Sequence, residues 1–256
     1  MPFGRRCAPA AIAAALSLAA AASATAADAD AGPPIAATGA SAPARPPFED
    51  EIRGFEAADR KAPPRHRPAV VFIGSSSIRM WQTLEKDFPR HRVLNRGFGG
   101  SQIADSVRYA DRILLPHKPA LVVMYAGSND INDGKTPATV AADFQAFTAK
   151  VWSQLPGTQI AFISIAPNPA RFAQVERVRE ANRLIAAACA ADQRLRFVDV
   201  FPLMLGEDGR PRRELFIDDG LHMNRKGYEL WIPVVSPLLD AVTPAARTST
   251  RRARVE

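Results

Sequence analysis

Short apolar runs alternate with longer amphipathic segments through residues 48–240 of this 256-residue chain. The apolar runs predict five strands, at residues 69–73, 92–95, 121–125, 159–165 and 196–200. Hydrophobic residues at helical spacing mark helices between the later strands: Val140, Phe144, Phe147 and Val151 in one segment, and Val175, Val178, Ala181, Leu184, Ile185 and Ala188 in the next. These stripes indicate faces that pack against a core. A further helix is predicted at residues 48–60, ahead of the first strand.

The alternation of strands and helices predicts how the domain is built. Parallel strands joined by right-handed helical crossovers place helices on both faces of the sheet. Both faces are then buried, which explains why the strands are continuously apolar. We therefore expect one α/β domain at residues 48–240, a three-layer α/β/α sandwich around a five-stranded, mainly parallel sheet.

The two ends of the chain have different compositions from this domain. Arg5 and Arg6 precede an apolar, alanine-rich stretch and the small-residue site Ala24-Thr25-Ala26, a pattern typical of an export signal at residues 1–26. Residues 27–47 are rich in Ala and Pro and predict a disordered linker, and residues 241–256 predict a disordered basic tail. We expect the protein to be exported, periplasmic or secreted in a bacterium, with no integral membrane segment after signal removal.

Charge and cysteine content narrow the function classes. The chain has 33 Lys and Arg against 26 Asp and Glu, a net charge of +7. No aromatic residues separate the arginines of the tail, so the sequence gives little support to nucleic-acid binding. Cys7 lies in the predicted signal, which leaves Cys189 alone, so no internal disulfide is expected. Cys189 is predicted to be a buried thiol on a helix.

Glycine-containing polar turns follow the first three predicted strands. They are Gly74-Ser75-Ser76-Ser77, Gly97-Phe98-Gly99-Gly100-Ser101 and Gly127-Ser128-Asn129-Asp130. Because ligands bind beyond the carboxyl ends of parallel strands, all three turns are expected at the functional edge. Each turn alone has a simpler explanation: serines that cap a helix, a tight turn, or an ordinary polar loop.

Several familiar motifs are incomplete in these turns. A dinucleotide-binding fingerprint needs glycine at position 102, where Gln102 stands, and a nucleophile elbow needs glycine where Ile78 stands. The polar stretch 128–134 lacks the final glutamate of a calcium loop. These absences disfavour a nucleotide cofactor, an α/β-hydrolase elbow and an EF-hand.

Near the C-terminus, Asp219 and His222 are three residues apart, just before a helix-like stretch. A serine hydroxyl is a weak nucleophile near neutral pH and needs a base whose tautomer is fixed by a third group. His222 is the proposed base, and Asp219 would orient its ring. Asp218 would assist Asp219 or cap the turn, and a metal held by these three residues would be short of ligands.

Together these blocks resemble the SGNH, or GDSL-like, hydrolases across residues 69–239. The matching positions are Gly74-Ser75-Ser76, Asn95-x-Gly97-x-Gly99-Gly100, Gly127-Ser128-Asn129-Asp130 and Asp219-x-x-His222. The resemblance implies a flavodoxin-like fold, a Ser76–His222–Asp219 triad and no cofactor or metal. It also implies an oxyanion hole made by the backbone N–H groups of Ser76 and Gly100 and the side-chain amide of Asn129.

The first block departs from the family pattern. Serine at positions 75 and 77 replaces the family's aspartate and leucine. Counting from the glycine selects Ser76 as nucleophile, with Ser77 and then Ser75 as less favoured alternatives.

The resulting hypothesis is an exported serine hydrolase that cleaves carboxylic esters, of esterase, lipase or acetylesterase type, through an acyl-enzyme on Ser76. The expected partner is a small-molecule, polysaccharide or lipid ester. Two alternatives stay open: an acyltransferase that uses the same residues on a carbohydrate, and a non-catalytic carbohydrate- or lipid-binding module. His66, His91 and His117 are expected to be solvated loop residues, and the loops 167–171 and 205–210 are candidates for shaping a pocket.

Overall fold

The computed structural model describes residues 47–61 and 70–242. Within them, five parallel strands form one sheet in the order β2-β1-β3-β4-β5. The strands are β1 Val70–Gly74, β2 Val93–Gly97, β3 Leu121–Tyr125, β4 Gln159–Ile163 and β5 Leu195–Val198. This is the flavodoxin-like strand order. The predicted α/β fold with a parallel sheet is confirmed, and the five strands lie within two residues of their expected starts and ends.

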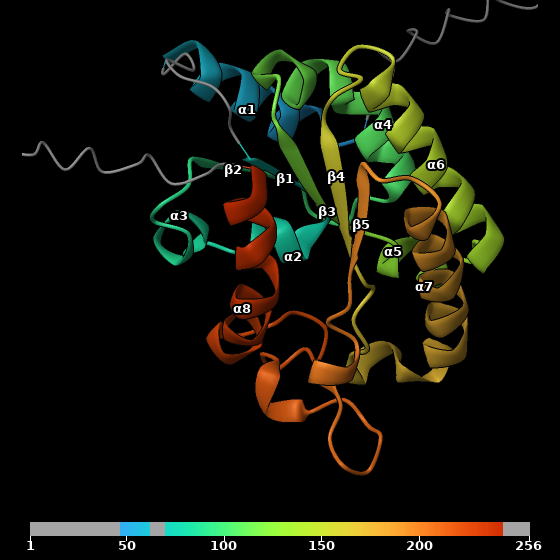
Figure 1. The fold of residues 1–256 in the computed structure, drawn as a ribbon. Coiled ribbons are helices and arrows are strands. Elements are labelled where there is room, and N and C mark those ends of the chain that lie inside the picture. The colour runs from blue at the N-terminus through green and yellow to red at the C-terminus, as the bar shows by residue number, and fades with distance from the viewer. Residues whose placement is uncertain (1–46, 62–69, 243–256) are drawn as a thin grey trace, which may run out of the picture. The chain divides into compact units, whose positions relative to one another are not determined.

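Helices surround the sheet (Figure 1). The α-helices are α1 Glu49–Lys61, α2 Ser76–Arg79, α3 Leu84–Asp87, α4 Ile103–Ile113, α5 Ser128–Asn132, α6 Pro137–Trp152, α7 Val175–Ala190 and α8 Arg225–Val242. Short 3₁₀ turns are η1 Leu115–His117, η2 Pro169–Gln174, η3 Pro202–Met204 and η4 Arg213–Leu215. The helices predicted from the stripes at 140–151 and 175–188 are α6 and α7, and the predicted lead-in helix is α1.

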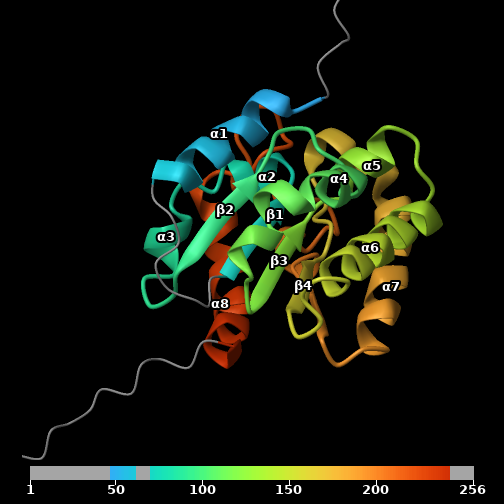
Figure 2. The ribbon, with the colours of Figure 1, turned by 90° about the horizontal axis from the view of Figure 1, so that it is seen from above.

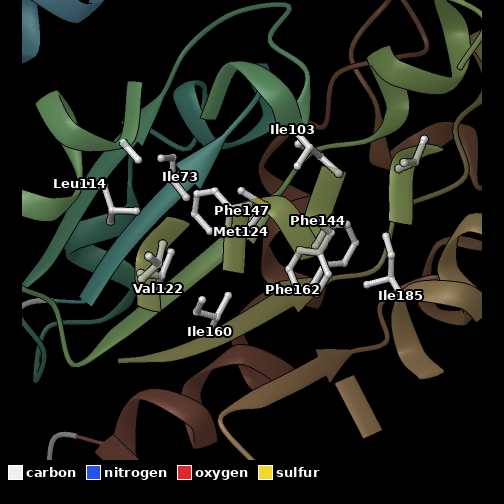
Figure 3. Packing of buried hydrophobic residues seen from close by; sticks show 14 of the residues in the cluster. Ile73, Ile103, Leu114, Val122, Met124, Phe144, Phe147, Ile160, Phe162 and Ile185 are labelled. Atoms are coloured by element: carbon white, nitrogen blue, oxygen red, sulfur yellow. The ribbon is translucent and has the colours of Figure 1, made fainter. Parts of the chain in front are cut away.

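Two hydrophobic layers sandwich the sheet. Side chains alternate along each strand, so Ile73, Met124 and Phe162 point toward the layer of α4, α6 and α7, while Phe72 and Val123 point toward α2, α3 and α8. Figure 2 shows these two helix layers on opposite sides of the strands. Figure 3 shows the first layer, where the rings of Phe144 and Phe162 meet edge to face with centroids 5.0 Å apart.

Several sequence predictions lie partly or wholly outside the described residues. They are the export signal, the linker up to residue 46, Ala69 as the first residue of a strand, the tail from residue 243 and the placement of His66. Cys189 lies buried on α7 as expected, and burial raises the pKa of its thiol to about 12. Among the described helices, none is both long and apolar enough to cross a bilayer.

Candidate active site

Ser76 occupies the first position of α2, directly after a sharp turn at the end of β1. Gly74 has φ +135°, and a Cβ there would lie 1.9 Å from the carbonyl oxygen of Tyr125. The next residue, Ser75, donates its N–H to that same oxygen at 3.0 Å. Only glycine permits this approach of β1 to β3. The turn therefore places Ser76 at the carboxyl edge of the sheet, at the start of α2.

The structure brings Ser76, His222 and Asp219 together. His222 Nε2 lies 2.9 Å from Ser76 Oγ, and His222 Nδ1 lies 2.6 Å from Asp219 Oδ2. With the proton of Nδ1 shared with Asp219, Nε2 is left to accept the proton of the Ser76 hydroxyl. This is the arrangement that activates a serine nucleophile.

Asp219 is held as a carboxylate by its own loop. Its partial burial opposes ionisation, but N–H groups of His222 and Leu221 donate to Oδ1 at 2.9 and 2.8 Å, and the His222 ring bonds Oδ2. Their combined effect lowers the pKa of Asp219 to about 2. Asp219 thus keeps a negative charge beside His222 across the pH range in which most esterases are assayed.

The loop that carries Asp219 and His222 is fastened at both ends. Ile217 donates its N–H to the carbonyl of His222 at 2.9 Å, and Asn224 donates to the carbonyl of Leu215 at 2.9 Å. The side chain of Arg213 binds the carbonyls of Ile217 and Asp218 at 2.6 and 2.7 Å. These bonds fix the imidazole relative to Ser76 before any substrate arrives.

The three expected oxyanion donors come from three different elements. Within the described part of the chain, no acceptor is bonded to the backbone N–H of Ser76 or of Gly100. Gly100 has φ +77°, and a Cβ there would meet nothing within 4 Å, so this stretch of backbone is open on that side. Asn129, on α5, donates one Nδ2 hydrogen to the carbonyl of Ser101 at 3.0 Å, which leaves its second hydrogen for a ligand.

Asp130, the residue after Asn129, links α5 to the first residue of α4, Ile103, which follows the loop of Gly100. Its buried carboxylate accepts the N–H of Ile103 at 3.3 Å and forms an ion pair with Lys135 at 3.0 Å. Burial raises the pKa of Asp130, while the bonds to Lys135 and Ile103 oppose this rise. This contact keeps two of the candidate oxyanion donors in register.

A small hollow beside Ser76 has a volume of about 20 Å³. It is lined by Ser75, Ser76, Ser77, Tyr125, Ser128, Asn129, Asn168, Arg171, Leu221 and His222. Most of these side chains are polar. A void needs about 10–15 Å³ to hold one water molecule, so the hollow has room for a very small group. A larger hollow, of about 500 Å³, lies between α1 and α2 and contains neither Ser76 nor His222.

Five lining residues had no assigned role in the sequence prediction: Tyr125, Ser128, Asn168, Arg171 and Leu221. Tyr125 ends the predicted strand 121–125, and its buried hydroxyl accepts the N–H of Ala166 at 3.4 Å. Arg171 lies in η2, within the loop 167–171 that the sequence singled out. The other candidate loop, 205–210, contributes nothing to the hollow. Proximity to the ends of strands is the signal that identifies Tyr125 and the loop after β4.

Two simpler interpretations of the sequence are wrong. Ser75 occupies the N-cap position of α2, but its side chain makes no capping hydrogen bond. His117 is not a solvated loop residue: it is buried, and its Nε2 lies 3.0 Å from Asp59 Oδ2 and 3.1 Å from an Arg96 nitrogen. The side chain of His91 is likewise buried and paired with Asp240 at 2.9 Å. Charged residues from distant segments create both environments.

No cluster of three or more His, Cys, Asp or Glu side chains suited to a metal ion occurs in residues 47–61 and 70–242. Asp218 is exposed, and the contact it makes near Asp219 is through its backbone carbonyl, which accepts from Arg213. The described groups of the candidate site are a hydroxyl, an imidazole, a carboxylate and a set of N–H donors.

Residues 73–230 match the model of the GDSL-like Lipase/Acylhydrolase family. The chain belongs to this family. The α1 subunit of platelet-activating factor acetylhydrolase IB from Homo sapiens is 30% identical over 171 residues, which cover 63% of this chain and 71% of that one. The subunit from Rattus norvegicus is 29% identical over the same length. Family membership identifies the protein as a hydrolase that acts on esters.

Solved structures share the fold of this GDSL-like hydrolase. A GDSL-like lipase from Bacteroides thetaiotaomicron superposes with a TM-score of 0.65 at 19% identity, covering 75% of this chain and all of the other. A carbohydrate esterase of family 3 from Talaromyces cellulolyticus superposes with a TM-score of 0.56 at 16% identity, covering 69% of this chain and all of the other. At these identities the likeness concerns the fold.

Proposed function

We propose that this GDSL-like hydrolase is a serine esterase that cleaves carboxylic esters with short acyl groups through an acyl-enzyme on Ser76. The observation that carries the proposal is the unbroken path of hydrogen-bond distances from Ser76 Oγ through the His222 ring to Asp219, at 2.9 and 2.6 Å. A hydroxyl in this setting can be deprotonated as it attacks.

The reaction has two halves. In the first, His222 Nε2 accepts the hydroxyl proton while Ser76 Oγ bonds to the ester carbonyl carbon. The imidazolium, stabilised by Asp219, then gives this proton to the alcohol oxygen as the carbon–oxygen bond breaks. In the second half, His222 takes a proton from water, the resulting hydroxide attacks the acyl-enzyme, and the proton returns to Ser76 Oγ as the acid leaves.

Charge develops on the carbonyl oxygen in both halves. The proposed donors to it are the N–H groups of Ser76 and Gly100 and the free hydrogen of Asn129 Nδ2. Such donors stabilise the transition state more than the ground state because they are already oriented where the negative charge forms.

The size of the hollow beside Ser76 supports a short acyl group. About 20 Å³ bounded largely by polar side chains suits an acetyl methyl better than an alkyl chain. The name of one similar protein, an acetylhydrolase, agrees with a short acyl group. The alcohol half of the ester extends on the open side of Gly100 in this proposal.

The test combines covalent labelling with turnover. An organophosphonate should add to a single serine, identified by mass spectrometry as Ser76, and p-nitrophenyl acetate should be hydrolysed. The variant Ser76→Ala should lose both reactions. A folded wild-type sample that is neither labelled nor active would favour the non-catalytic binding module instead.

Hydrolysis and acyl transfer give different products from the same acyl-enzyme. With p-nitrophenyl acetate and an excess of a soluble oligosaccharide, the proposed esterase releases acetate in step with nitrophenol. An acylated sugar formed in place of acetate would identify the acyltransferase.

Export through residues 1–26 is a second part of the proposal, based on the composition of that segment. Expression of the full chain in a bacterial host, followed by fractionation and N-terminal sequencing, should find a shortened protein outside the cytoplasm. Full-length protein confined to the cytoplasm would contradict it.

A further inference from the structure

Arg171 places a guanidinium group in the catalytic hollow, next to Asn129. One nitrogen of the guanidinium, Nη1, donates to Asn129 Oδ1 at 2.9 Å and to Ser128 Oγ at 2.9 Å. Arg171 makes no ion pair with any carboxylate in the described residues, although the charge of Asp133 lies near enough to favour the guanidinium. This arginine is therefore bound to an amide instead of to a counter-ion.

The loop that carries Arg171 is built to hold it there. The side chain of Asn168 is buried, and its Oδ1 accepts the N–H of Arg171 at 3.0 Å. The next N–H back along the chain, that of Ala170, donates to the carbonyl of Gly220 at 3.0 Å. Since Gly220 belongs to the loop of Asp219 and His222, the same short segment contacts both Asn129 and the loop that carries the base.

The amide of Asn129 has two different ends, and only one can stabilise an oxyanion. The Nδ2 end donates hydrogens, whereas the Oδ1 end would repel a negative oxygen. A rotation by half a turn would exchange them. It would then set Oδ1 against the Ser101 carbonyl, which accepts from Nδ2 at 3.0 Å, and would set Nδ2 against the donating nitrogen of Arg171.

We propose that Arg171 is a positioning residue that fixes the orientation of the Asn129 amide and so prepares its Nδ2–H group to bind the oxyanion. A charged donor on Oδ1 also polarises the amide, which makes the opposite N–H group a stronger donor. Arg171 acts through Asn129 and not on the ester itself. This inference rests on the proposed role of Ser76 and Asn129 in ester hydrolysis.

The role predicts how two substitutions combine. Asn129→Ala removes the donor and should lower kcat by about 10²–10³-fold, with KM nearly unchanged. Arg171→Met keeps an unbranched apolar stem but removes the guanidinium, and should lower kcat by about 10-fold to 100-fold, again with little change in KM. In the Asn129→Ala background, Arg171→Met should lower kcat by less than about 2-fold, because the group that it orients is already absent.

Arg177 offers a matched control. Its guanidinium also bridges to the segment after α5, donating to the carbonyls of Gly134 and Lys135 at 3.2 and 2.7 Å, and none of its hydrogen bonds is to Asn129. Arg177→Met should therefore leave kcat within about 2-fold of wild type. Arg171→Lys keeps the charge but offers only one short donor group, and should recover part of the activity lost in Arg171→Met.

The measurements are kcat and KM for p-nitrophenyl acetate in the wild type and five variants, with thermal unfolding of each as a check on folding. If Arg171→Met lowered kcat by the same factor in the wild type and in Asn129→Ala, the inference would be overturned, because the arginine would then act independently of Asn129. An effect on KM alone, or one restricted to esters that carry a carboxylate, would also overturn it in favour of direct substrate binding. A wild type that is neither labelled at Ser76 nor active would instead defeat the proposed function, so the two failures are distinguishable.

Discussion

His222 Nε2 lies 2.9 Å from Ser76 Oγ although the two residues are 146 positions apart in the chain. The contact depends on the sheet: β1 delivers Ser76 to its carboxyl edge, and the loop before α8 returns to the same edge. A second contact from α8 supports it, because Tyr228 donates its hydroxyl to the carbonyl of Ser77 at 2.8 Å. The first helix after β1 and the last helix of the domain are thereby joined beside the hydroxyl.

Ser76→Ala and His222→Ala should each lower kcat for p-nitrophenyl acetate by about 10⁶-fold, and the double variant should be no worse than either alone. The reason is that a hydroxyl without its base, or a base without its hydroxyl, cannot carry out the same step. Steady-state kinetics of the three variants measures this. Ser153→Ala, which removes the hydroxyl of the exposed residue directly after α6, is the matched control and should keep wild-type turnover. Additive losses in the double variant would show that the two side chains do not work as a pair.

Asp219→Asn should lower kcat by about 10⁴-fold while leaving the fold intact. An uncharged amide cannot stabilise the positive charge that develops on the His222 ring, and its NH₂ group cannot accept the ring N–H. Asp219 has a pKa of about 2, below its unfolded value, so any stability gained from its ionisation is present above about pH 4 and is lost as the pH falls toward 2. Asparagine at this position should therefore reduce the sensitivity to acid unfolding as well as the turnover.

Asp218→Asn distinguishes the two adjacent carboxylates. Asp218 uses its backbone carbonyl to accept from Arg213, which asparagine can do equally well. Turnover within about 3-fold of wild type is expected, as for other exposed substitutions. If Asp218→Asn were instead the more damaging change, the assignment of Asp219 as the partner of His222 would have to be withdrawn.

Gly74→Ala should destabilise the protein by more than about 3 kcal/mol, because its methyl group would lie 1.9 Å from the Tyr125 carbonyl oxygen at φ +135°. Urea unfolding measures the free energy of unfolding of Gly74→Ala and of a control, Gly134→Ala. At Gly134, φ is +97° and nothing lies within 4 Å of the added carbon. That control should cost only about 1 kcal/mol. Similar unfolding midpoints for the two variants would mean that β1 and β3 can separate at this end without penalty.

The strands and the residues of the candidate site could be predicted from the sequence because both depend on local pattern. Continuous apolar runs mark strands that are buried on both faces, and in a parallel sheet the residue after each strand must lie at one edge. This topology was enough to expect the three glycine-containing turns near one another, and the resemblance to the SGNH hydrolases selected Ser76, Gly100 and Asn129 within them. The spacing of Asp219 and His222 is equally local, since both belong to one turn.

The environments of Arg171 and His117 could not be predicted in this way. Arg171 meets Asn129 from a residue 42 positions away, and His117 meets Asp59 across 58 positions. Both encounters depend on where loops and the first helix pack, and no periodicity in the sequence encodes this. The Pro-His-Lys-Pro segment around His117 has the composition of an exposed turn, yet α1 covers it.

His117 should make the stability of the fold depend on pH. Burial, and then the nearby charge of Arg96, lower the pKa of His117 below its usual 6.5, although Asp59 opposes the shift. The unfolded chain therefore binds a proton at a higher pH than the folded one, and the free energy of unfolding decreases as the pH falls below about 6.5. His117→Gln removes the titratable ring but keeps a side chain that can donate a hydrogen bond to Asp59. Urea unfolding between about pH 8 and pH 5 should show a smaller loss of stability in the variant than in the wild type, and parallel curves would contradict the prediction.

The hollow beside Ser76 should make the enzyme selective for short acyl groups. In a series of p-nitrophenyl esters with one leaving group, kcat/KM should be highest for the acetate and lower by at least about 10-fold for the octanoate. The physical reason is twofold: a space of about 20 Å³ cannot enclose an alkyl chain, and the largely polar side chains that line it cannot form hydrogen bonds with such a chain. The assays must stay below the micelle concentration of the long esters, so that aggregation does not imitate poor binding. A preference for the octanoate would require the acyl chain to lie outside this hollow, on the surface of the protein, and would move the enzyme from the acetylesterases toward the lipases.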